Sequence, residues 1–184
     1  MVLLESKQTL TVNDKAPDFR LNGTDGKTYS LPSFSQAKAV LIIFGCNHCP
    51  YVKAKMAAIR ELHESFASRG LQIILINSND PVNYPDDDFE HMIQFAQENR
   101  FPFPYLVDDT QDVAKQYGAV CTPDPFLFDG KHELAWHGRL DDAMSPGAPV
   151  TKKDMAEAIE MVLQGKKVDK PFRPSMGCSI KWKE

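Results

Sequence analysis

Residues 39–50 read AVLIIFGCNHCP, an unbroken apolar run that ends in two cysteines and a proline. The run Ala39–Phe44 is typical of a strand buried on both faces of a sheet, as happens when helices cover both sides. After Cys49 and Pro50, apolar residues recur at helical spacing through 52–66. The sequence therefore predicts a strand, a short turn that carries Cys46 and Cys49, and a helix that begins just after them.

The spacing Cys46-x-x-Cys49 at the start of a helix favours redox chemistry. The N–H groups and the dipole at a helix N-terminus stabilise a thiolate, which is the nucleophile in disulfide exchange. Two thiols one turn apart can close a disulfide, so the second can resolve a mixed disulfide made by the first. His48, between them, is expected to stabilise the Cys46 thiolate by charge or by a hydrogen bond.

The rest of the chain alternates strand-like and helix-like patterns. Asp25-Gly26 predicts a hairpin within residues 16–31, and Thr151 with Asp154 resembles a capping box. Further strands are expected at 71–76 and 105–107, and a hairpin is expected to join 126–128 with 134–136. Helices are expected at 89–96 and 155–162, and a short one is expected between a cap at Thr110 and Gly118. This order is typical of an α/β fold with a mixed sheet flanked by helices.

Composition excludes several classes of protein. The 184 residues fit one domain. With 42% hydrophobic and 25% charged residues the chain is unlike a disordered one, and its net charge of −4 is unlike that of a basic nucleic-acid binder. No apolar stretch approaches the ~20 residues of a membrane helix, and 1–12 lacks the pattern of a signal peptide. We therefore expect a cytoplasmic protein without nucleic-acid or membrane partners. In that reducing compartment paired cysteines are more often catalytic or metal-binding than structural.

The last twenty residues differ from the rest. Residues 165–184 are rich in proline and carry a net charge of +4, which leaves −8 on the domain of residues 1–164. Ile180 and Trp182 predict that this tail docks on the acidic domain, which would bring Cys178 close to Cys121 or to the cysteine pair. The alternatives are a loose tail with an incidental thiol and, for Cys121, a small buried apolar residue.

Three motifs together resemble the thioredoxin-like superfamily, in the branch shared by TlpA/ResA-type reductases and AhpC/TSA-type peroxiredoxins. They are the opening at 16–19 (APDF), the cysteine pair, and Cys121-Thr122-Pro123. With the ending at 177–182 (GCSIKW), they look like the peroxiredoxin-like group of thioredoxin-family proteins.

The resemblance covers roughly residues 12–163 and implies a thioredoxin-like fold with an N-terminal hairpin extension. It also implies a cis peptide before Pro123, which would face the cysteine pair, and a Thr122 backbone that pairs with the substrate. Asn47 joins Thr122 as a substrate-binding candidate.

Three functions remain open at this stage. The first is a thiol–disulfide oxidoreductase without a cofactor, in which Cys46 attacks a protein or small-molecule disulfide, Cys49 resolves it, and a cellular dithiol restores the pair. The second is a peroxiredoxin-like peroxidase with Cys49 as the attacking thiol. Three and seven residues before the attacking cysteine, where a peroxiredoxin has a threonine and a proline, this sequence has Cys46 and Ile42. The arginine that peroxiredoxins carry near the strand after the cis-proline is not evident. The third is a copper or zinc carrier, to which His137 would contribute, although a second paired cysteine knuckle for zinc is absent.

Overall fold

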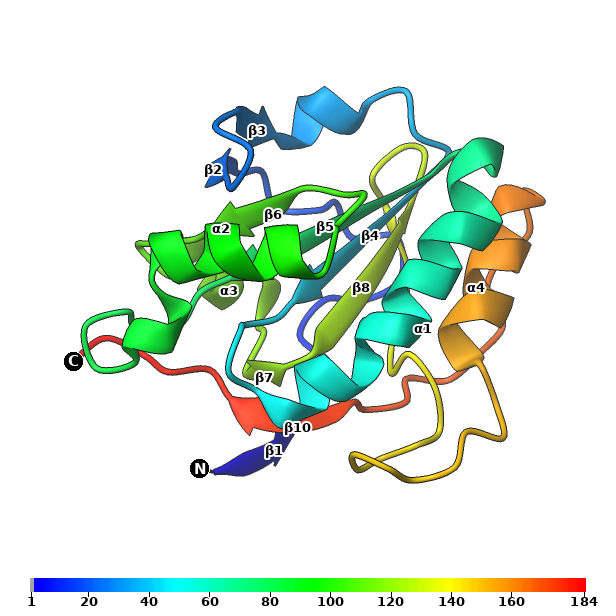
Figure 1. The fold of residues 1–184 in the computed structure, drawn as a ribbon. Coiled ribbons are helices and arrows are strands. Elements are labelled where there is room, and N and C mark those ends of the chain that lie inside the picture. The colour runs from blue at the N-terminus through cyan, green and yellow to red at the C-terminus, as the bar shows by residue number, and fades with distance from the viewer. Residues whose placement is uncertain (1) are drawn as a thin grey trace.

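A seven-stranded mixed sheet forms the centre of the computed structural model, which describes residues 2–184 (Figure 1). Its strands follow the order β3-β2-β6-β5-β4-β8-β9. Their bounds are β2 (Arg20–Gly23), β3 (Thr28–Ser30), β4 (Ala39–Phe44), β5 (Leu71–Asn77), β6 (Tyr105–Val107), β8 (Asp124–Asp129) and β9 (Leu134–His137). The predicted α/β fold is confirmed, as is the hairpin, whose Gly26 has φ of 80°.

The apolar run that opened the sequence analysis is the middle of this sheet. β4 pairs in parallel with β5 and antiparallel with β8, and all six of its residues are fully buried. Leu41 and Ile43 belong to the core on one face of the sheet, whereas Val40 and Ile42 belong to the core on the other. Because successive side chains alternate between the faces, an uninterrupted apolar run is what this position requires.

Helices cover both faces of the sheet. The helices α1 (Pro50–Phe66), α2 (Phe89–Glu98) and α4 (Asp154–Leu163) lie on one side, and the short helix α3 (Asp112–Tyr117) lies on the other (Figure 1). Single 3₁₀ turns occupy Leu31–Phe34, Ala67–Arg69 and Pro85–Asp87. The helical spacing in the sequence runs up to residue 66. In the structure α1 ends at Phe66, and Gly70, with φ of 111°, follows the 3₁₀ turn after it.

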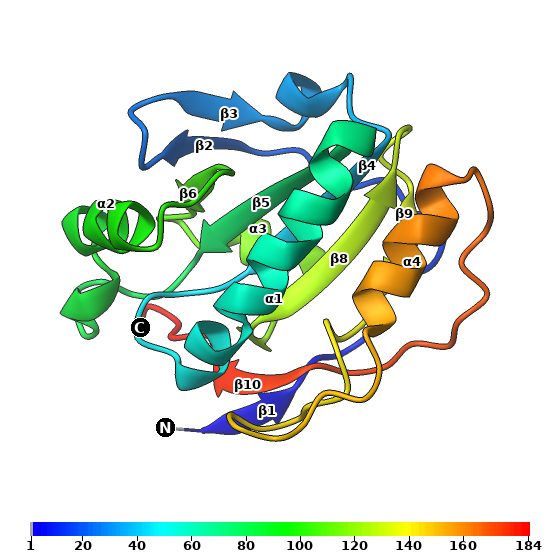
Figure 2. The same cartoon turned by 45° about the vertical axis from the view of Figure 1, so that its right-hand side comes forward.

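A second, three-stranded sheet joins the two ends of the chain. It consists of β1 (Leu3–Glu5), β10 (Met176–Ser179) and β7 (Cys121–Thr122), in the antiparallel order β1-β10-β7. Figure 2 shows β10 beside β1, below the N-terminus of α1. The sequence analysis missed this sheet because strands of two to four residues leave almost no alternating pattern to detect.

Ion pairs and apolar contacts hold the tail on the rest of the chain. The Asp154 carboxylate, almost fully buried, accepts hydrogen bonds from Arg173 Nη1 at 2.7 Å and from Arg139 Nε at 2.8 Å. Ile180 is buried, but Trp182 is 40% exposed, so only one of the two apolar residues expected to dock is covered. The tail thus lies along the domain as an ordered segment.

Two predicted helix starts were wrong. Lys153, not Thr151, is the N-cap residue of α4, because Thr151 bonds to Asp142 and Asp154 is held by arginines. Gln111, not Thr110, is the N-cap residue of α3.

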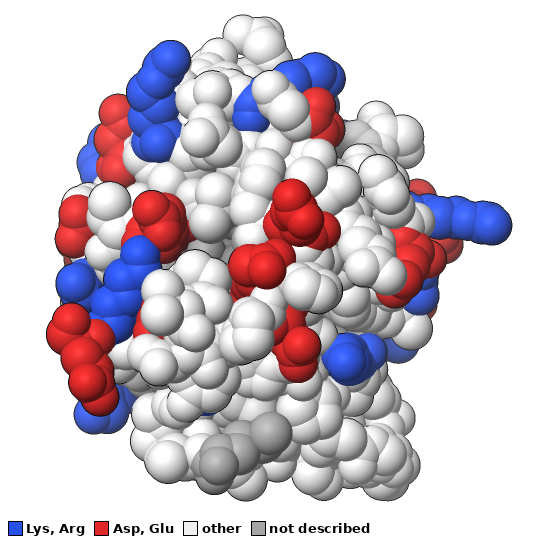
Figure 3. Space-filling view, turned by 60° about the vertical axis from the view of Figure 1, so that its left-hand side comes forward, with Lys and Arg blue, Asp and Glu red and all other residues white. Residues whose placement is uncertain are grey.

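The surface carries charges of both signs. On the face shown in Figure 3, acidic and basic side chains are interspersed with uncharged surface. Among the helices of the described residues, none combines the length and apolarity that a bilayer span requires.

Candidate redox site

The cysteine pair occupies the connection between β4 and α1. Gly45 leaves the sheet with its N–H donating to the Ile76 carbonyl at 2.9 Å, and a Cβ on it would lie 2.8 Å from Leu75 Cδ1. Cys49 is the N-cap residue of α1, and Pro50 occupies the first helical position, where its missing N–H costs nothing. The predicted strand, turn and helix therefore place Cys49 at a helix N-terminus.

The loop at Pro123 lies against both cysteines. The Thr122–Pro123 peptide is cis, as the resemblance predicted. The Thr122 hydroxyl is 3.5 Å from Cys46 Sγ, and the Thr122 carbonyl oxygen is 3.2 Å from Cys49 Sγ. Thr122 thus contacts both sulfurs, while its backbone is paired with Cys178 of β10 rather than open for a substrate.

A third sulfur belongs to the same cluster. Cys178 Sγ lies 2.9 Å from Cys49 Sγ, and neither residue is exposed. None of the four cysteines is in a disulfide in this structure. Cys121 is also fully buried, and burial together with the nearby Asp124 charge raises the pKa of its thiol. A thiol held protonated in this way is a poor nucleophile.

Asp87 is the central polar residue that the sequence analysis did not identify. Its buried carboxylate accepts hydrogen bonds from His48 Nδ1 at 2.5 Å, from the Asn47 N–H at 2.8 Å and from Asn79 Nδ2 at 2.7 Å. The signal available was its position in the loop after β5, on the sheet edge where α/β proteins bind ligands. Residues 77–80 end β5 at the same edge, and Asn79 among them donates to Asp87.

His48 and Asn47 are oriented by this carboxylate. The side chain of Asn47 donates to the Asp86 carbonyl at 2.8 Å and accepts from the Tyr105 hydroxyl at 2.7 Å. The hydrogen bond from His48 to Asp87 raises the pKa of the imidazole. His48 and Asp87 both lie close to Cys46, since the potential ligand atoms of the three side chains are all within 4.8 Å of one another.

The position at the N-terminus of α1 and the neighbouring groups favour a thiolate on Cys49. In its ionised form the Cys49 sulfur is stabilised most by its interaction with Cys46, and further by Cys178, Thr122 and the Val52 N–H, which lower its pKa to about 4 against the opposing effect of burial. The same interaction with Cys49, burial and the Asp87 charge raise the pKa of Cys46. Sequence reasoning had expected the thiolate on Cys46.

We expect the reduced protein to carry a thiolate at neutral pH. A lowered pKa means that the charge is present above the folded-state value and is lost only as the pH falls through about 4. The ultraviolet absorbance of the thiolate should follow that transition, and the Cys49→Ser variant should lack it. A single transition near pH 9, the ordinary value for a thiol, would contradict the assignment.

Two of the donors that could hold a metal ion, His48 and Asp87, are already hydrogen-bonded to each other. Cys46, His48 and Asp87 are the only group of three or more metal-type donors that the described residues bring together. A zinc ion accepts these donor types, but binding through His48 Nδ1 would require the hydrogen bond to Asp87 to break. His137, the predicted extra ligand, instead bonds through Nε2 to Asp124 at 2.7 Å and stacks on Phe126.

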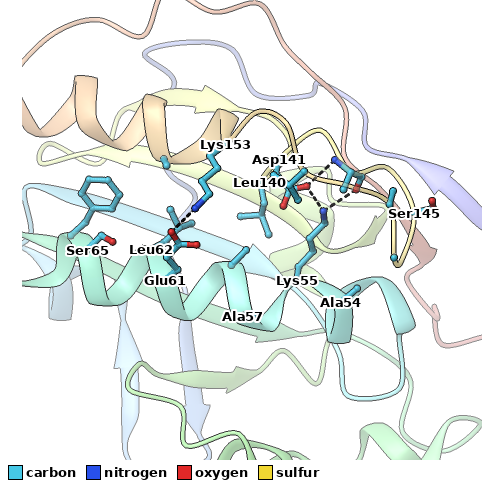
Figure 4. Close-up of a pocket in the computed structure, with 17 residues that line it drawn as sticks. Ala54, Lys55, Ala57, Glu61, Leu62, Ser65, Leu140, Asp141, Ser145 and Lys153 are labelled. Atoms are coloured by element: carbon cyan, nitrogen blue, oxygen red, sulfur yellow. Dashed lines mark hydrogen bonds and ion pairs between the residues drawn. The ribbon is translucent and has the colours of Figure 1, made fainter.

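Two hollows lie near α1. The larger, about 500 Å³, separates α1 from the segment before α4, and the partly buried ion pair of Lys55 with Asp141 links the two across it (Figure 4). None of the described residues that line it is a cysteine. The smaller, about 390 Å³, is lined by His48, Tyr84 and Lys181 among others. None of its described lining residues is a cysteine either, but the partly exposed His48 on its wall lies between the two cysteines in the sequence.

A strand, a Cys-x-x-Cys turn and a helix facing a cis-proline on a mixed sheet define a protein of thioredoxin-like fold. The model of the AhpC/TSA family matches residues 12–137, and the chain belongs to this family. It is similar to an uncharacterized conserved protein from Geobacillus kaustophilus, with 40% identity, coverage of 100% of this chain and 97% of the other, and a TM-score of 0.94.

More distant relatives have names that refer to activities. The chain is 24% identical over 85% of its length to the thiol-disulfide oxidoreductase ResA of Geobacillus thermodenitrificans, 80% of which is covered. It is 28% identical over 55% of its length to a chloroplastic peroxiredoxin Q of Populus jackii, and it spans only 44% of that protein. The chain thus has both thiol–disulfide oxidoreductases and peroxiredoxins among its relatives, and these support an oxidoreductase activity in general.

Proposed function

We propose that the protein is a thiol–disulfide oxidoreductase whose redox pair is Cys46 and Cys49, with Cys49 as the attacking thiolate. The observation that carries this proposal is the position of Cys49 at the N-terminus of α1, where thiol and N–H donors lower its pKa while the pKa of Cys46 is raised. Relatives named as thiol-disulfide oxidoreductases agree with it. Within the pair, the roles are the reverse of those expected from sequence.

The reaction has two exchange steps. The Cys49 thiolate attacks one sulfur of a substrate disulfide, which forms a mixed disulfide and releases the other substrate sulfur as a thiolate. Cys46 then loses its proton and attacks the Cys49 sulfur, so the Cys46–Cys49 disulfide forms and the second substrate thiol leaves. Two electrons pass from the cysteine pair to the substrate, and a dithiol reductant returns them.

The pair of Asp87 and His48 would receive the proton of Cys46. While Cys49 is a thiolate, its contact with Cys46 keeps the Cys46 thiol protonated. Once Cys49 is bound in a mixed disulfide it carries no charge, and that cause disappears. The pKa of Cys46 then falls at the step at which it must attack, and the nearby Asp87 carboxylate can accept its proton.

A second candidate function is reduction of hydroperoxides by Cys49. A buried cysteine whose thiolate is stabilised at a helix N-terminus is the group that such chemistry needs, and relatives named as peroxiredoxins support it. Against it, the peroxiredoxin threonine position is held by Cys46, and the family's arginine is not evident in the sequence.

Two assays on the full-length protein separate these functions. We expect it to accelerate the reduction of insulin disulfides by dithiothreitol, and to consume hydrogen peroxide at least about tenfold more slowly than it turns over disulfides. Cys46→Ser/Cys178→Ser, which removes both thiols beside the Cys49 sulfur, should trap a mixed disulfide between Cys49 and a disulfide substrate, because no resolving thiol is left. Efficient peroxide turnover without insulin reduction would replace the first function with the second.

A further inference from the structure

The strand β10 occupies the place at which a substrate chain was expected. The resemblance implied that the backbone of Thr122 pairs with the substrate. In this structure Thr122 pairs antiparallel with Cys178, and Cys121 pairs with Ser179. The Ile180 N–H donates to the Val120 carbonyl at 3.0 Å, which continues the contact past the strand. The chain thus places its own strand β10, with the sulfur of Cys178, against Thr122 and the cysteine pair.

The approach of β10 depends on a residue without a side chain. A Cβ on Gly177 would lie 2.0 Å from the Thr122 carbonyl oxygen and 3.1 Å from the Pro123 nitrogen, and both are backbone atoms. Glycine therefore allows the two strands to come this close. Cys178, the next residue, then reaches Cys49, with 2.9 Å between the two sulfurs. A disulfide bond is about 2.0 Å long, so a small movement would bring the sulfurs to bonding distance.

We propose that Cys178 is a third redox-active thiol of this protein and forms a disulfide with Cys49 as an alternative to the Cys46–Cys49 disulfide. This inference rests on the proposed redox role of Cys49. Cys49 then has two partners, one from the turn before its own helix and one from the tail.

The exchange between the two disulfides needs no external oxidant. The Cys178 thiolate attacks the Cys49 sulfur, the Cys46–Cys49 bond breaks, and the Cys49–Cys178 bond forms. Cys46 leaves as a thiolate and takes up the proton that Cys178 has lost. The number of electrons on the protein does not change, so the second disulfide stores the same oxidation and returns Cys46 to the thiol form.

The charges around Cys178 agree with this order of events. Burial and the contact with the Cys49 thiolate raise the pKa of Cys178 to about 12, and the Lys181 ammonium opposes them. When Cys49 is already in a disulfide with Cys46 it has no charge, so only burial continues to hold the Cys178 proton. Cys178 thus becomes a nucleophile after Cys49 has been oxidised rather than before.

Disulfide mapping of the full-length protein tests the proposal. Each variant is oxidised with oxidised glutathione, blocked with N-ethylmaleimide, digested with trypsin and analysed by mass spectrometry. No Lys or Arg lies between Cys46 and Cys49, so that disulfide stays within one peptide, whereas Cys49–Cys178 joins two. We expect both products from the unmodified protein and only the cross-linked product from Cys46→Ser.

Two further variants make the result specific. Cys178→Ser should lose the cross-link and keep the Cys46–Cys49 disulfide, which also shows that the variant is folded at the site. Cys121→Ser removes a buried thiol on the neighbouring strand and should give the same products as the unmodified protein. In Cys46→Ser/Cys178→Ser, the glutathione mixed disulfide on Cys49 should persist at least about tenfold longer than in Cys46→Ser.

The proposal is overturned if Cys46→Ser yields glutathionylated Cys49 with Cys178 alkylated, or if the unmodified protein never gives the cross-link. Neither outcome depends on insulin reduction, so it would leave the proposed function standing. Conversely, a protein that forms both disulfides but reduces no substrate would contradict the proposed function and not this inference.

Discussion

Replacement of Cys49 by serine is expected to lower the rate of disulfide reduction about 100-fold or more. The remaining thiol of the pair, Cys46, loses its interaction with Cys49 in this variant, but burial and the Asp87 charge still hold its pKa above the ordinary value of 9.0, so about 1% of it or less is thiolate at neutral pH. Serine does not substitute for a thiolate in disulfide exchange. The measurement is the initial rate of insulin reduction for both single-serine variants of the pair under the same conditions.

The two variants should differ in kind as well as in rate. Cys46→Ser should still attack the substrate through Cys49, and with Cys178 also replaced by serine it should stop at the mixed disulfide, whereas Cys49→Ser should form no adduct. Cys121→Ser, which removes another fully buried cysteine, is the matched control and should keep the activity. A Cys49→Ser variant that traps substrate on Cys46 would return the attacking role to Cys46.

Replacement of Asp87 by alanine is expected to reduce the free energy of unfolding by about 3–5 kcal/mol. The buried carboxylate receives hydrogen bonds from Asn47, His48 and Asn79, and its loss would leave all three donors without an acceptor inside the protein. Urea denaturation monitored by circular dichroism measures the change.

The neighbouring Asp88 provides a matched control. It also accepts a hydrogen bond from a histidine, His91, but at the exposed N-terminus of α2, so Asp88→Ala should cost much less stability than Asp87→Ala. Asp87→Asn should be milder than Asp87→Ala because the amide keeps an acceptor oxygen. It should lower the pKa of His48, measurable by NMR titration. Equal costs for the two alanine variants would mean that burial of Asp87 has no energetic consequence.

The local patterns of the sequence predicted the central sheet and the position of the cysteine pair. An apolar run such as Ala39–Phe44 needs only its own composition to identify a two-sided strand, and Asp25-Gly26 needs only its neighbours to identify a hairpin. The helix start at Asp154 was mispredicted because arginines from elsewhere in the chain, Arg139 and Arg173, use the carboxylate that a capping box would need.

The site could be predicted only as far as its local part. Cys46, Cys49 and His48 lie in one turn, so their proximity follows from the sequence. Asp87 and Cys178 reach the same place from distant segments, through a single 3₁₀ turn and a four-residue strand, and neither leaves a periodic signal. The location of the negative charge within the pair depends on those distant groups, which explains why sequence reasoning assigned it to Cys46.

The small sheet also determines where this molecule presents an unpaired strand edge. Backbone groups on an open edge are a template for pairing with other chains, which is a route to aggregation. β10 covers the edge of β7 beside the sulfurs, and β1 in turn covers β10. Of the two outer strands, β7 is buried and β1 carries the exposed Leu3, so any edge-to-edge association of two copies through this sheet would begin at β1 rather than at the reactive thiols.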